Sequence, residues 1–234
     1  MHAPSPLMGE GWGEGGTGAP RPAPLGTPEA AATARALARA ANTLEELKAA
    51  IAAFEGLSLK ATATQIVFAD GNPEARLMLI GEAPGAEEDR RGLPFVGAAG
   101  QLLDRMLAAI GRDRTSSYIT NIVNWRPPGN RKPSPAEMSL CLPFITRHIA
   151  LVKPAVVVLL GDTAAKTLSG RSEGITRLRG KWLAWRDADG PDSAEPIPMM
   201  PTFHPAYLLR TPSQKREAWA DLLAVKRKLG ELEG

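Results

Sequence analysis

The sequence predicts an α/β fold with three layers, α/β/α, in which a central parallel sheet of about four strands lies between helices. Two observations support this fold class. Short apolar runs recur along the chain, and each ends at glycine, proline or a polar residue. Stretches with the apolar spacing of a helix separate these runs, and strands that alternate with helices build parallel sheets. A chain of 234 residues can bury the core that such a fold needs.

Four segments are the expected strands. Their apolar residues follow one another without polar alternation, as in strands buried on both faces of a sheet. The second segment is also rich in β-branched and aromatic residues, which favour strands. The expected strands are 77–80, 117–123, 155–160 and 197–203.

Helix start signals stand between these strands. A threonine or serine cap, followed by proline or by a glutamate three residues later, opens helices at Thr27, Thr43 and Ser134. The expected helices are 27–41, 43–54, 101–111, 134–153, a short one after Gly161, and 213–229. The segment 171–195 has no clear period, and we expect a loop with short strands there.

The last expected helix is amphipathic. Its apolar residues are Trp219, Leu222, Leu223 and Leu229, and we expect them to pack against the sheet. His148 lies between apolar residues of the helix before it, and we interpret this histidine as structural.

Composition limits the class of protein. Residues 1–26 are dominated by glycine, proline and alanine, which predicts a disordered tail before one domain at 27–234. The net charge of +3 is compatible with a polyanionic partner but does not identify one. One cysteine cannot form a disulfide framework or a four-cysteine metal site within the chain. Without an apolar span or a secretory signal, we expect a cytoplasmic monomer that makes no contact with membranes.

The stretch 77–100 predicts the active site. It reads as a buried strand, a loop with Gly81 and Gly85, and the start of a helix. Ligands of parallel sheets bind where the strands end at their carboxyl edge. The loop fits neither the dinucleotide fingerprint nor the P-loop, which needs a Gly-Lys-Ser/Thr sequence. A purely structural turn is the alternative interpretation of the loop alone.

Two polar residues follow other strands at the same edge. Asn121 interrupts the second apolar run near its end, and His204 follows the last one. A turn-stabilising asparagine and a core histidine are the structural alternatives. An asparagine amide both donates and accepts hydrogen bonds, and it can therefore pair with a ligand edge that carries one donor and one acceptor.

Three motifs resemble the family 4 uracil-DNA glycosylases. GEAPG, the ED that follows it, GLPFVG and AGQLL are similar to the first motif of that family at matching spacing. YITNIVNWRPPGNRKP and FHPAYLLR continue the resemblance in the same order, from about residue 54 to the end of the chain. Three ordered motifs are more specific than one glycine loop. The chain is identified as a family 4-like member of the uracil-DNA glycosylase superfamily.

The resemblance implies hydrolysis of the bond between uracil and deoxyribose in DNA, which starts base excision repair. The partner is uracil-containing DNA, single- or double-stranded, and the nucleotide must be flipped out of the stack. His204 would donate a hydrogen bond to O2 of the departing uracil, and Glu82 would position the attacking water. Phe95 would stack on the base, Asn121 would read its edge, and Glu88 would lie near C5 and repel the methyl group of thymine.

The remaining expected contacts come from the same motifs. The base-binding loop also contributes Gly81, Ala83 and Gly85. The expected DNA contacts are three cations of the proline-rich loop, Arg126, Arg131 and Lys132, and three residues that could wedge into the base stack, Leu208, Leu209 and Arg210. No metal ligands are expected.

The chain departs from the family at the cysteines that hold an iron–sulfur cluster. The four positions read Phe54, Leu57, Trp125 and Cys141. A cubane cluster needs about four thiolates, so the sequence predicts that none is bound. The three bulky apolar residues predict a hydrophobic plug in place of the cluster.

Other functions stay open at this point. The chain could recognise uracil or damaged DNA without cleaving it, as the lost cysteines hint. It could also be another nucleotide-binding α/β protein, although the loop lacks a phosphate-binding lysine. A related group with an Arg-Ile-His insertion fits less well, because the loop RPPGNRKP has no histidine. The sequence leaves strand preference, other deaminated bases and the water-positioning residue undecided.

Overall fold

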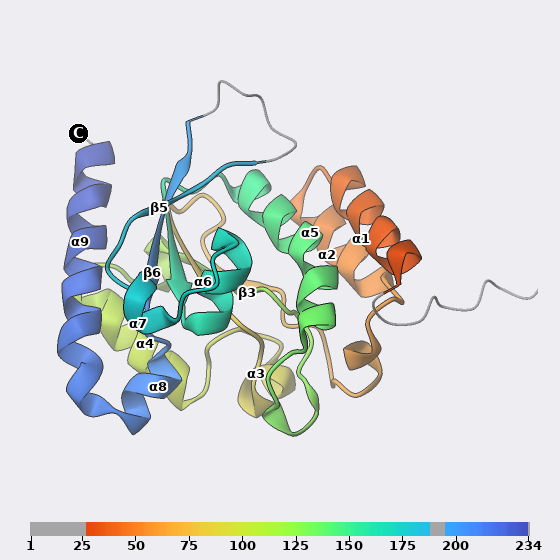
Figure 1. The fold of residues 1–234 in the computed structure, drawn as a ribbon, viewed down its shortest axis with the longest axis horizontal. Helices are drawn as coiled ribbons and strands as arrows, with labels where there is room; N and C mark the ends of the chain where they lie inside the picture. Colours follow the sequence, from red (N-terminus) through yellow and green to blue (C-terminus); the bar gives the residue numbers. More distant parts are fainter. Residues whose placement is uncertain (1–26, 188–194, 234) are drawn as a thin grey trace, which may run out of the picture.

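A computed structural model of the chain describes residues 27–187 and 195–233 (Figure 1). The expected tail at 1–26 lies outside the described residues, and so does part of the segment expected to be a loop with short strands. Among the helices that are described, none is both long and apolar enough to cross a membrane.

A six-stranded sheet in the order β1-β3-β2-β4-β6-β5 forms the centre of the fold. Its four middle strands are parallel, which confirms the expected core of the sheet. The strands are β1 Ala69–Gly71, β2 Leu77–Gly81, β3 Tyr118–Asn121, β4 Val156–Leu160, β5 Leu183–Trp185 and β6 Ile197–Thr202.

Two antiparallel edge strands extend the sheet beyond the expected four. β1 pairs with β3, and β5 pairs with β6. Each has three residues, too few to show a hydrophobic period in the sequence. β5 lies in the segment where short strands were expected, whereas nothing in the sequence indicated β1.

Helices cover both faces of the sheet. The three caps at Thr27, Thr43 and Ser134 form as expected, each accepting a hydrogen bond from a first-turn backbone N–H. The helices are α1 Pro28–Ala40, α2 Leu44–Ala53, α3 Ala86–Arg91, α4 Ala98–Ala109, α5 Pro135–Val152, α6 Asp162–Ser169, α7 Ile175–Leu178, α8 Pro205–Arg210 and α9 Lys215–Glu233. Short 3₁₀ helices are η1 Ser58–Ala61, η2 Arg114–Ser116, η3 Pro128–Asn130 and η4 Pro212–Gln214.

Alternate side chains of β2 separate the core into two layers. Met78 and Ile80 belong to a buried cluster with residues of α1, α2, α5 and α6. Leu77 and Leu79 belong to a second cluster with residues of α4 and α9. Figure 1 shows α1, α2 and α5 on one side of the sheet and α9 and α4 on the other. The three-layer α/β/α architecture is therefore confirmed.

The apolar face of α9 differs from the expected one. Leu222 and Leu229 are buried as expected, but Trp219 and Leu223 remain 41% and 36% exposed. The buried residues follow an i, i+4, i+7, i+11 pattern that begins at Ala218. Trp219 and Leu223 each lie one position further on, about 100° around the helix, and therefore face outward.

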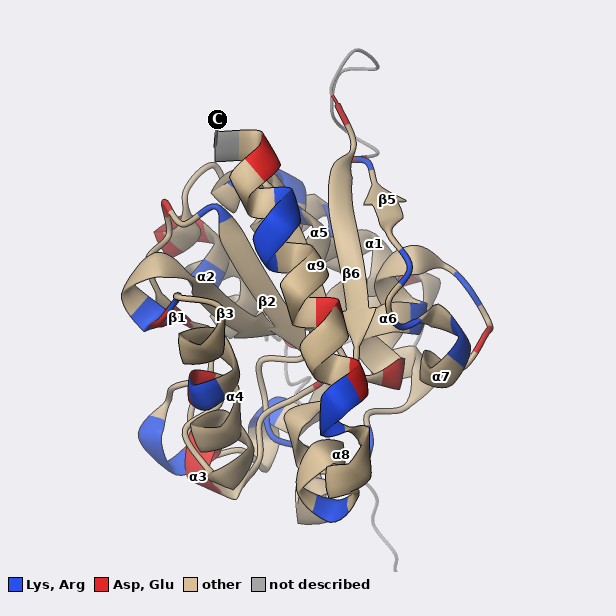
Figure 2. Ribbon diagram, turned by 90° about the vertical axis from the view of Figure 1, so that its left-hand side faces the viewer, with Lys and Arg blue, Asp and Glu red and all other residues tan. Residues whose placement is uncertain are grey.

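Strand register brings the functional segments to one edge. Gly81 pairs with Asn121, and Leu160 pairs with Thr202, so the four parallel strands end at the same level. The segments that follow β2, β3, β4 and β6 meet there. In Figure 2, α3, α4 and α8 lie together at that end of the molecule.

Candidate active site

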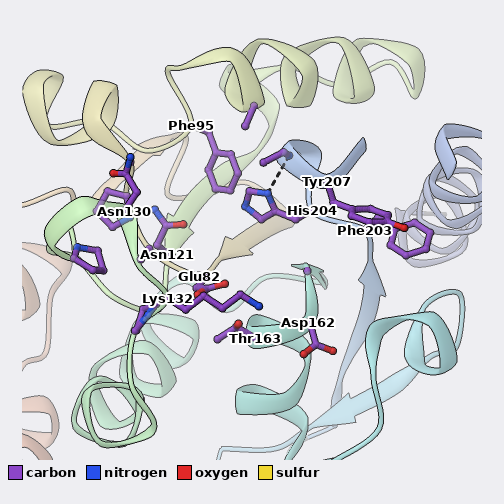
Figure 3. A pocket seen from close by; sticks show the side chains of 18 of the residues that line it. Glu82, Phe95, Asn121, Asn130, Lys132, Asp162, Thr163, Phe203, His204 and Tyr207 are labelled. Atoms are coloured by element: carbon purple, nitrogen blue, oxygen red, sulfur yellow. Dashed lines mark hydrogen bonds between the residues drawn. The ribbon is translucent and has the colours of Figure 1, made fainter. Parts of the chain in front are cut away.

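A pocket of about 540 Å³ opens at the carboxyl edge of the sheet (Figure 3). Its size lies within the range of ligand-binding clefts. Most of its lining residues come from the three motifs. The expected site residues that line it are Glu82, Ala83, Gly85, Glu88, Phe95, Asn121, Arg131, Lys132, His204 and Arg210. Gly81 lies directly beneath it, whereas Arg126, Leu208 and Leu209 do not line it.

Gly81 is required because two side chains cross its backbone. A Cβ atom at this position would lie 2.3 Å from Oδ1 of Asn121 and 2.6 Å from Cζ of Phe95. Both distances are shorter than real Cβ contacts. The glycine that ends β2 therefore allows the Phe95 ring and the Asn121 amide to lie over the end of the strand.

Phe95 has an unusual backbone for a non-glycine residue. Its φ is 54°, in the left-handed region, which costs an L-residue about 1–2 kcal/mol. The side chain is buried, and its ring centroid lies 5.5 Å from that of His204 at an interplanar angle of 30°. Strained residues held by their surroundings cluster at functional sites. Phe95 and His204 thus form one wall of the pocket.

Asn121 carries a buried oxygen without a partner. The residue is 3% exposed, and its Oδ1 receives no hydrogen bond from the described residues. An unsatisfied buried acceptor costs about 1–3 kcal/mol. Asn124, three residues later, behaves as a structural asparagine, because its Nδ2 donates to the carbonyl of Val67 at 3.0 Å. The turn interpretation therefore fits Asn124, and Asn121 presents its amide to the pocket.

His204 is both the cap of α8 and part of the pocket wall. Its Nδ1 accepts a hydrogen bond from the backbone N–H of Ala206 at 3.1 Å (dashed in Figure 3). The proton of the neutral ring therefore resides on Nε2. Burial lowers the pKa of His204 to about 4, helped by the charge of Arg210 and opposed by Glu88. At neutral pH the ring is thus an uncharged Nε2–H donor.

The Glu88 carboxylate, which was expected to lie near C5 of the base, holds the backbone of two loops together. Its Oε1 accepts hydrogen bonds from the backbone N–H groups of Val96 and Gly97, both at 2.9 Å. Its Oε2 accepts one from Gly85 at 3.1 Å. The carboxylate therefore joins the glycine loop to the turn that carries Phe95. It also lines the pocket, and its expected role near C5 of the base stays a prediction.

Glu82 and Lys132 come from different loops, and both side chains line the pocket (Figure 3). Within the described ranges, neither side chain has a hydrogen-bond or ion-pair partner. A free carboxylate at the pocket wall can accept a hydrogen bond from water, and a free ammonium group can meet a phosphate.

The other two cations of the proline-rich loop have internal partners. Arg131 forms a two-pronged ion pair with Glu137, at 2.7 and 2.8 Å. This hydrogen bonding lowers the pKa of Glu137 to about 2, against the opposing effect of burial. Nε of Arg126 donates to Oδ1 of Asn130 at 2.7 Å. The two arginines therefore shape the loop, and among the described residues Lys132 is the one of its three cations whose side chain has no internal partner.

The expected wedge is corrected at Leu208. This side chain is 1% exposed and packs in a cluster with Leu102, Phe203 and Ala218. It cannot insert into DNA because it fills the core under α8. Leu209 is 39% exposed, and Arg210 follows it at the end of the helix.

The positions of the family's cluster cysteines lie inside an apolar core. Phe54, Leu57, Trp125 and Cys141 are all at most 7% exposed and belong to the same buried cluster. The ring of Phe144 lies 5.4 Å from that of Phe54. Burial raises the pKa of the Cys141 thiol to about 12, so it is not a thiolate. Three apolar side chains and one un-ionised thiol do not fit an iron–sulfur cluster, and their burial in one apolar cluster supports the expected plug.

His148 is structural, as expected. It is buried at 1% exposure, its Nε2 lies 2.9 Å from the hydroxyl of Tyr118, and its ring stacks on Phe68. It does not line the pocket.

Sequence reasoning missed several residues around the site. Thr163, Thr176 and Asp162 line the pocket, and Asp162 accepts a hydrogen bond from the N–H of Ile175 at 2.8 Å. Arg114 contacts the turn at Phe95 from outside the pocket. No motif marks these residues. The sequence Gly161-Asp162 at the end of a strand was nevertheless a usable signal for Asp162 and Thr163.

Known proteins that are similar to this chain point to one family. The family model described as the uracil DNA glycosylase superfamily matches residues 68–223. The type-4 uracil-DNA glycosylase of Archaeoglobus fulgidus is 35% identical over 200 residues, covering 82% of this chain and 94% of the relative. Similar proteins from Sulfurisphaera tokodaii and Thermotoga maritima are 36% and 40% identical over 180 and 153 residues. The first match covers 75% of this chain and 80% of the Sulfurisphaera protein, and the second covers 65% of this chain and 76% of the Thermotoga protein. The chain therefore belongs to the uracil-DNA glycosylase superfamily and is similar to its type-4 members.

Proposed function

We propose that this protein is a monofunctional uracil-DNA glycosylase, which hydrolyses the N-glycosidic bond of uracil in DNA. One observation carries the proposal: the partnerless Oδ1 of Asn121 shares a pocket with the stacking face of Phe95 and the imidazole of His204. Asn121 ends β3, His204 follows β6, and Phe95 lies in the turn between α3 and α4. The type-4 relatives named above support the same activity.

Asn121 selects the base. Its Oδ1 accepts the N3–H of uracil, and its Nδ2 donates to O4. Cytosine has an unprotonated N3 and an amino group at position 4, so both contacts become mismatched. Because Oδ1 is buried, the protein gains a hydrogen bond only when a base with a donor at N3 enters. Phe95 stacks on that base, which contributes about 1–3 kcal/mol.

His204 stabilises the leaving group. As the bond between C1′ and N1 breaks, the sugar gains positive charge and uracil leaves as an anion. The Nε2–H of the neutral ring donates to O2, where negative charge develops. A neutral donor suits this step because it need not transfer its proton. Glu82 positions the water, whose oxygen bonds to C1′ while its proton is released to the surroundings and uracil is protonated.

DNA is held around the rim of the pocket. Lys132 and Arg210 line the pocket and offer positive charge to phosphates. Leu209 is the exposed apolar side chain that fills the gap left by the flipped nucleotide. Arg126 and Arg131 contribute to DNA binding mainly by holding the loop that presents Lys132.

No iron–sulfur cluster takes part in this proposal. The loops that a cluster would tie together are joined by the apolar plug of Phe54, Leu57, Trp125 and Cys141. No cysteine is among the described residues that line the pocket.

The test is a cleavage assay with a matched pair of asparagine variants. An oligonucleotide with one uracil is incubated with the parent, with Asn121→Ala or with Asn124→Ala, and treated with alkali. We expect cleavage by the parent and a loss in kcat/KM of about ten- to a hundredfold for Asn121→Ala. Because Asn121 has an unsatisfied oxygen, this variant should melt no lower than the parent.

Asn124→Ala serves as the control. It should lower the melting temperature, since Asn124 tethers the backbone at Val67, and leave activity per folded molecule intact. A parent protein that binds uracil DNA without cleaving it would instead favour a recognition module.

A further inference from the structure

The turn that carries Phe95 is held in place by charged side chains on both sides. On one side, Glu88 receives the backbone N–H groups of Val96 and Gly97. On the other side, Arg114 donates to the carbonyl oxygen atoms of Pro94, at 3.1 Å, and Phe95. Consecutive peptide groups of one short turn are therefore fixed by side chains from α3 and η2.

The guanidinium of Arg114 is itself rigidly placed. Its Nε donates to Oδ1 of Asp104 at 2.9 Å, and its Nη1 donates to Oδ2 of Asp70 at 2.6 Å. Asp104 belongs to α4, and Asp70 to the edge strand β1. The side chain is only 24% exposed. The planar fork thus reaches two carboxylates and two carbonyls at once, which a lysine ammonium cannot do.

The held conformation is one that Phe95 would not adopt unaided. Its φ of 54° lies in the left-handed region, and its carbonyl lies so close to Gly100 that a Cβ there would be 1.6 Å from the oxygen. This conformation directs the ring over Gly81 and toward His204. Without a partner for its carbonyl, the residue can return to the ordinary backbone regions, and its ring then leaves the pocket wall.

We infer that Arg114 is a positioning residue of this enzyme: it fixes the backbone of Phe95 so that the ring is ready to stack on a flipped base. The inference rests on the proposed function, because it assigns the base to the face of Phe95. Arg114 acts only through that ring. It touches neither the substrate nor the reacting atoms.

A double-variant experiment tests this assignment. Arg114→Lys retains a cation between Asp70 and Asp104 but loses the fork, and Arg105→Lys, on the exposed side of α4, is the matched control. Single-turnover kcat/KM on uracil-containing single strands should fall about tenfold for Arg114→Lys and stay unchanged for Arg105→Lys. In a Phe95→Ala background, Arg114→Lys should cost nothing further. Equal losses in the two backgrounds would overturn the inference.

Binding supplies a readout that a merely structural role would not move. Affinity is measured for strands with one deoxyuridine and for strands with a tetrahydrofuran abasic analogue, which has no base to stack. Arg114→Lys should weaken binding to the deoxyuridine strand alone, and equal weakening of both would refute the role. This comparison also decides the case if Phe95→Ala has no measurable activity. A parent that excises no uracil contradicts the proposed function, whereas an active parent with an unaffected Arg114→Lys contradicts only the positioning role.

Discussion

Two polar atoms without partners among the described residues define the site at the scale of single residues. Oδ1 of Asn121 is buried with no donor. His204 is only half-buried, and its Nδ1 is taken by the N–H of Ala206, which leaves Nε2 as the ring nitrogen that carries the proton. Native proteins rarely leave buried polar atoms unpaired. The strand β3 fixes Asn121, and the cap of α8 fixes His204. Asn121 Oδ1 can accept a hydrogen bond from a ligand, and His204 Nε2–H can donate one. Together they match a base that carries both an N–H donor and a carbonyl acceptor.

His204 gives the prediction that belongs to this scale. His204→Asn keeps an acceptor for the N–H of Ala206 and therefore keeps the cap of α8, but its shorter side chain withdraws the Nε2 donor. Because that hydrogen bond strengthens only as uracil leaves, the chemical rate should fall about a hundredfold to a thousandfold with little change in DNA affinity. Single-turnover kinetics and fluorescence anisotropy measure the two quantities. Unchanged chemistry in this variant would remove His204 from the mechanism.

At the scale of helices and loops, short elements orient the site residues toward the pocket. α8 is a six-residue helix that starts at His204, so the same turn that caps the helix presents the ring to the pocket. It also separates two neighbouring leucines, because Leu208 faces the core and Leu209 faces outward. The sequence could not distinguish these leucines, since a single turn is too short to show a period.

The two leucines should respond oppositely to truncation. Leu209→Ala should lower excision from double-stranded DNA by about tenfold and from single strands far less, because only a duplex leaves a gap to fill. Leu208→Ala should instead lower the free energy of unfolding by about 2–5 kcal/mol, with normal activity per folded molecule. Denaturant melts measure the free energy of unfolding, and parallel assays on single- and double-stranded DNA measure excision. A selective loss on duplex DNA in Leu208→Ala would contradict this assignment.

The apolar plug explains how the loops are tied together without thiolates. Phe54 and Leu57 follow α2, Trp125 follows β3, and Cys141 lies in α5, so the plug joins segments far apart in sequence. Burial of large apolar side chains supplies the cohesion that ligand bonds would give.

Cys141 is therefore expected to be chemically silent. With its thiol buried and its pKa raised to about 12, it should react with a thiol reagent only after unfolding, because the thiolate is the reactive form. The purified protein should contain no stoichiometric iron or acid-labile sulfide. Absorbance near 400 nm together with bound iron would contradict the plug.

At the scale of the whole molecule, parallel strands bring the site together. The four parallel strands end at one level. The segments that follow them therefore meet in one pocket, although Glu82 and His204 are more than 120 positions apart in the sequence. α8, which ends at Arg210, lies at this end of the molecule (Figure 2). The same architecture buries His148 within the helix layer and half-buries His204 at the pocket, and this desolvation links stability to pH.

Stability should fall on mild acidification. Burial lowers the pKa of His204 to about 4 and that of His148 to about 3, whereas an unfolded histidine titrates near 6.5. Below pH 6.5 the unfolded chain therefore binds more protons, and each histidine removes stability at about 1.4 kcal/mol per pH unit until its folded pKa is reached. Urea melts between pH 7.5 and 4.5 measure this slope. His204→Asn should roughly halve it, and an equal slope in the variant would show that His204 does not titrate as described.

The sequence by itself determined the parallel strands, the capped helices, the family and most pocket residues. It did so because apolar runs, caps and ordered motifs are local patterns. It also shows a single cysteine, whereas a cubane cluster needs about four thiolates. Only the tertiary structure decided which side of a short helix faces the core, as for Leu208 and Leu209, and which loop cations are already paired, as for Arg131. It alone brought Arg114 to the carbonyl of Phe95. These outcomes depend on contacts between distant segments, and a side chain's partner across the fold leaves no local mark in the sequence.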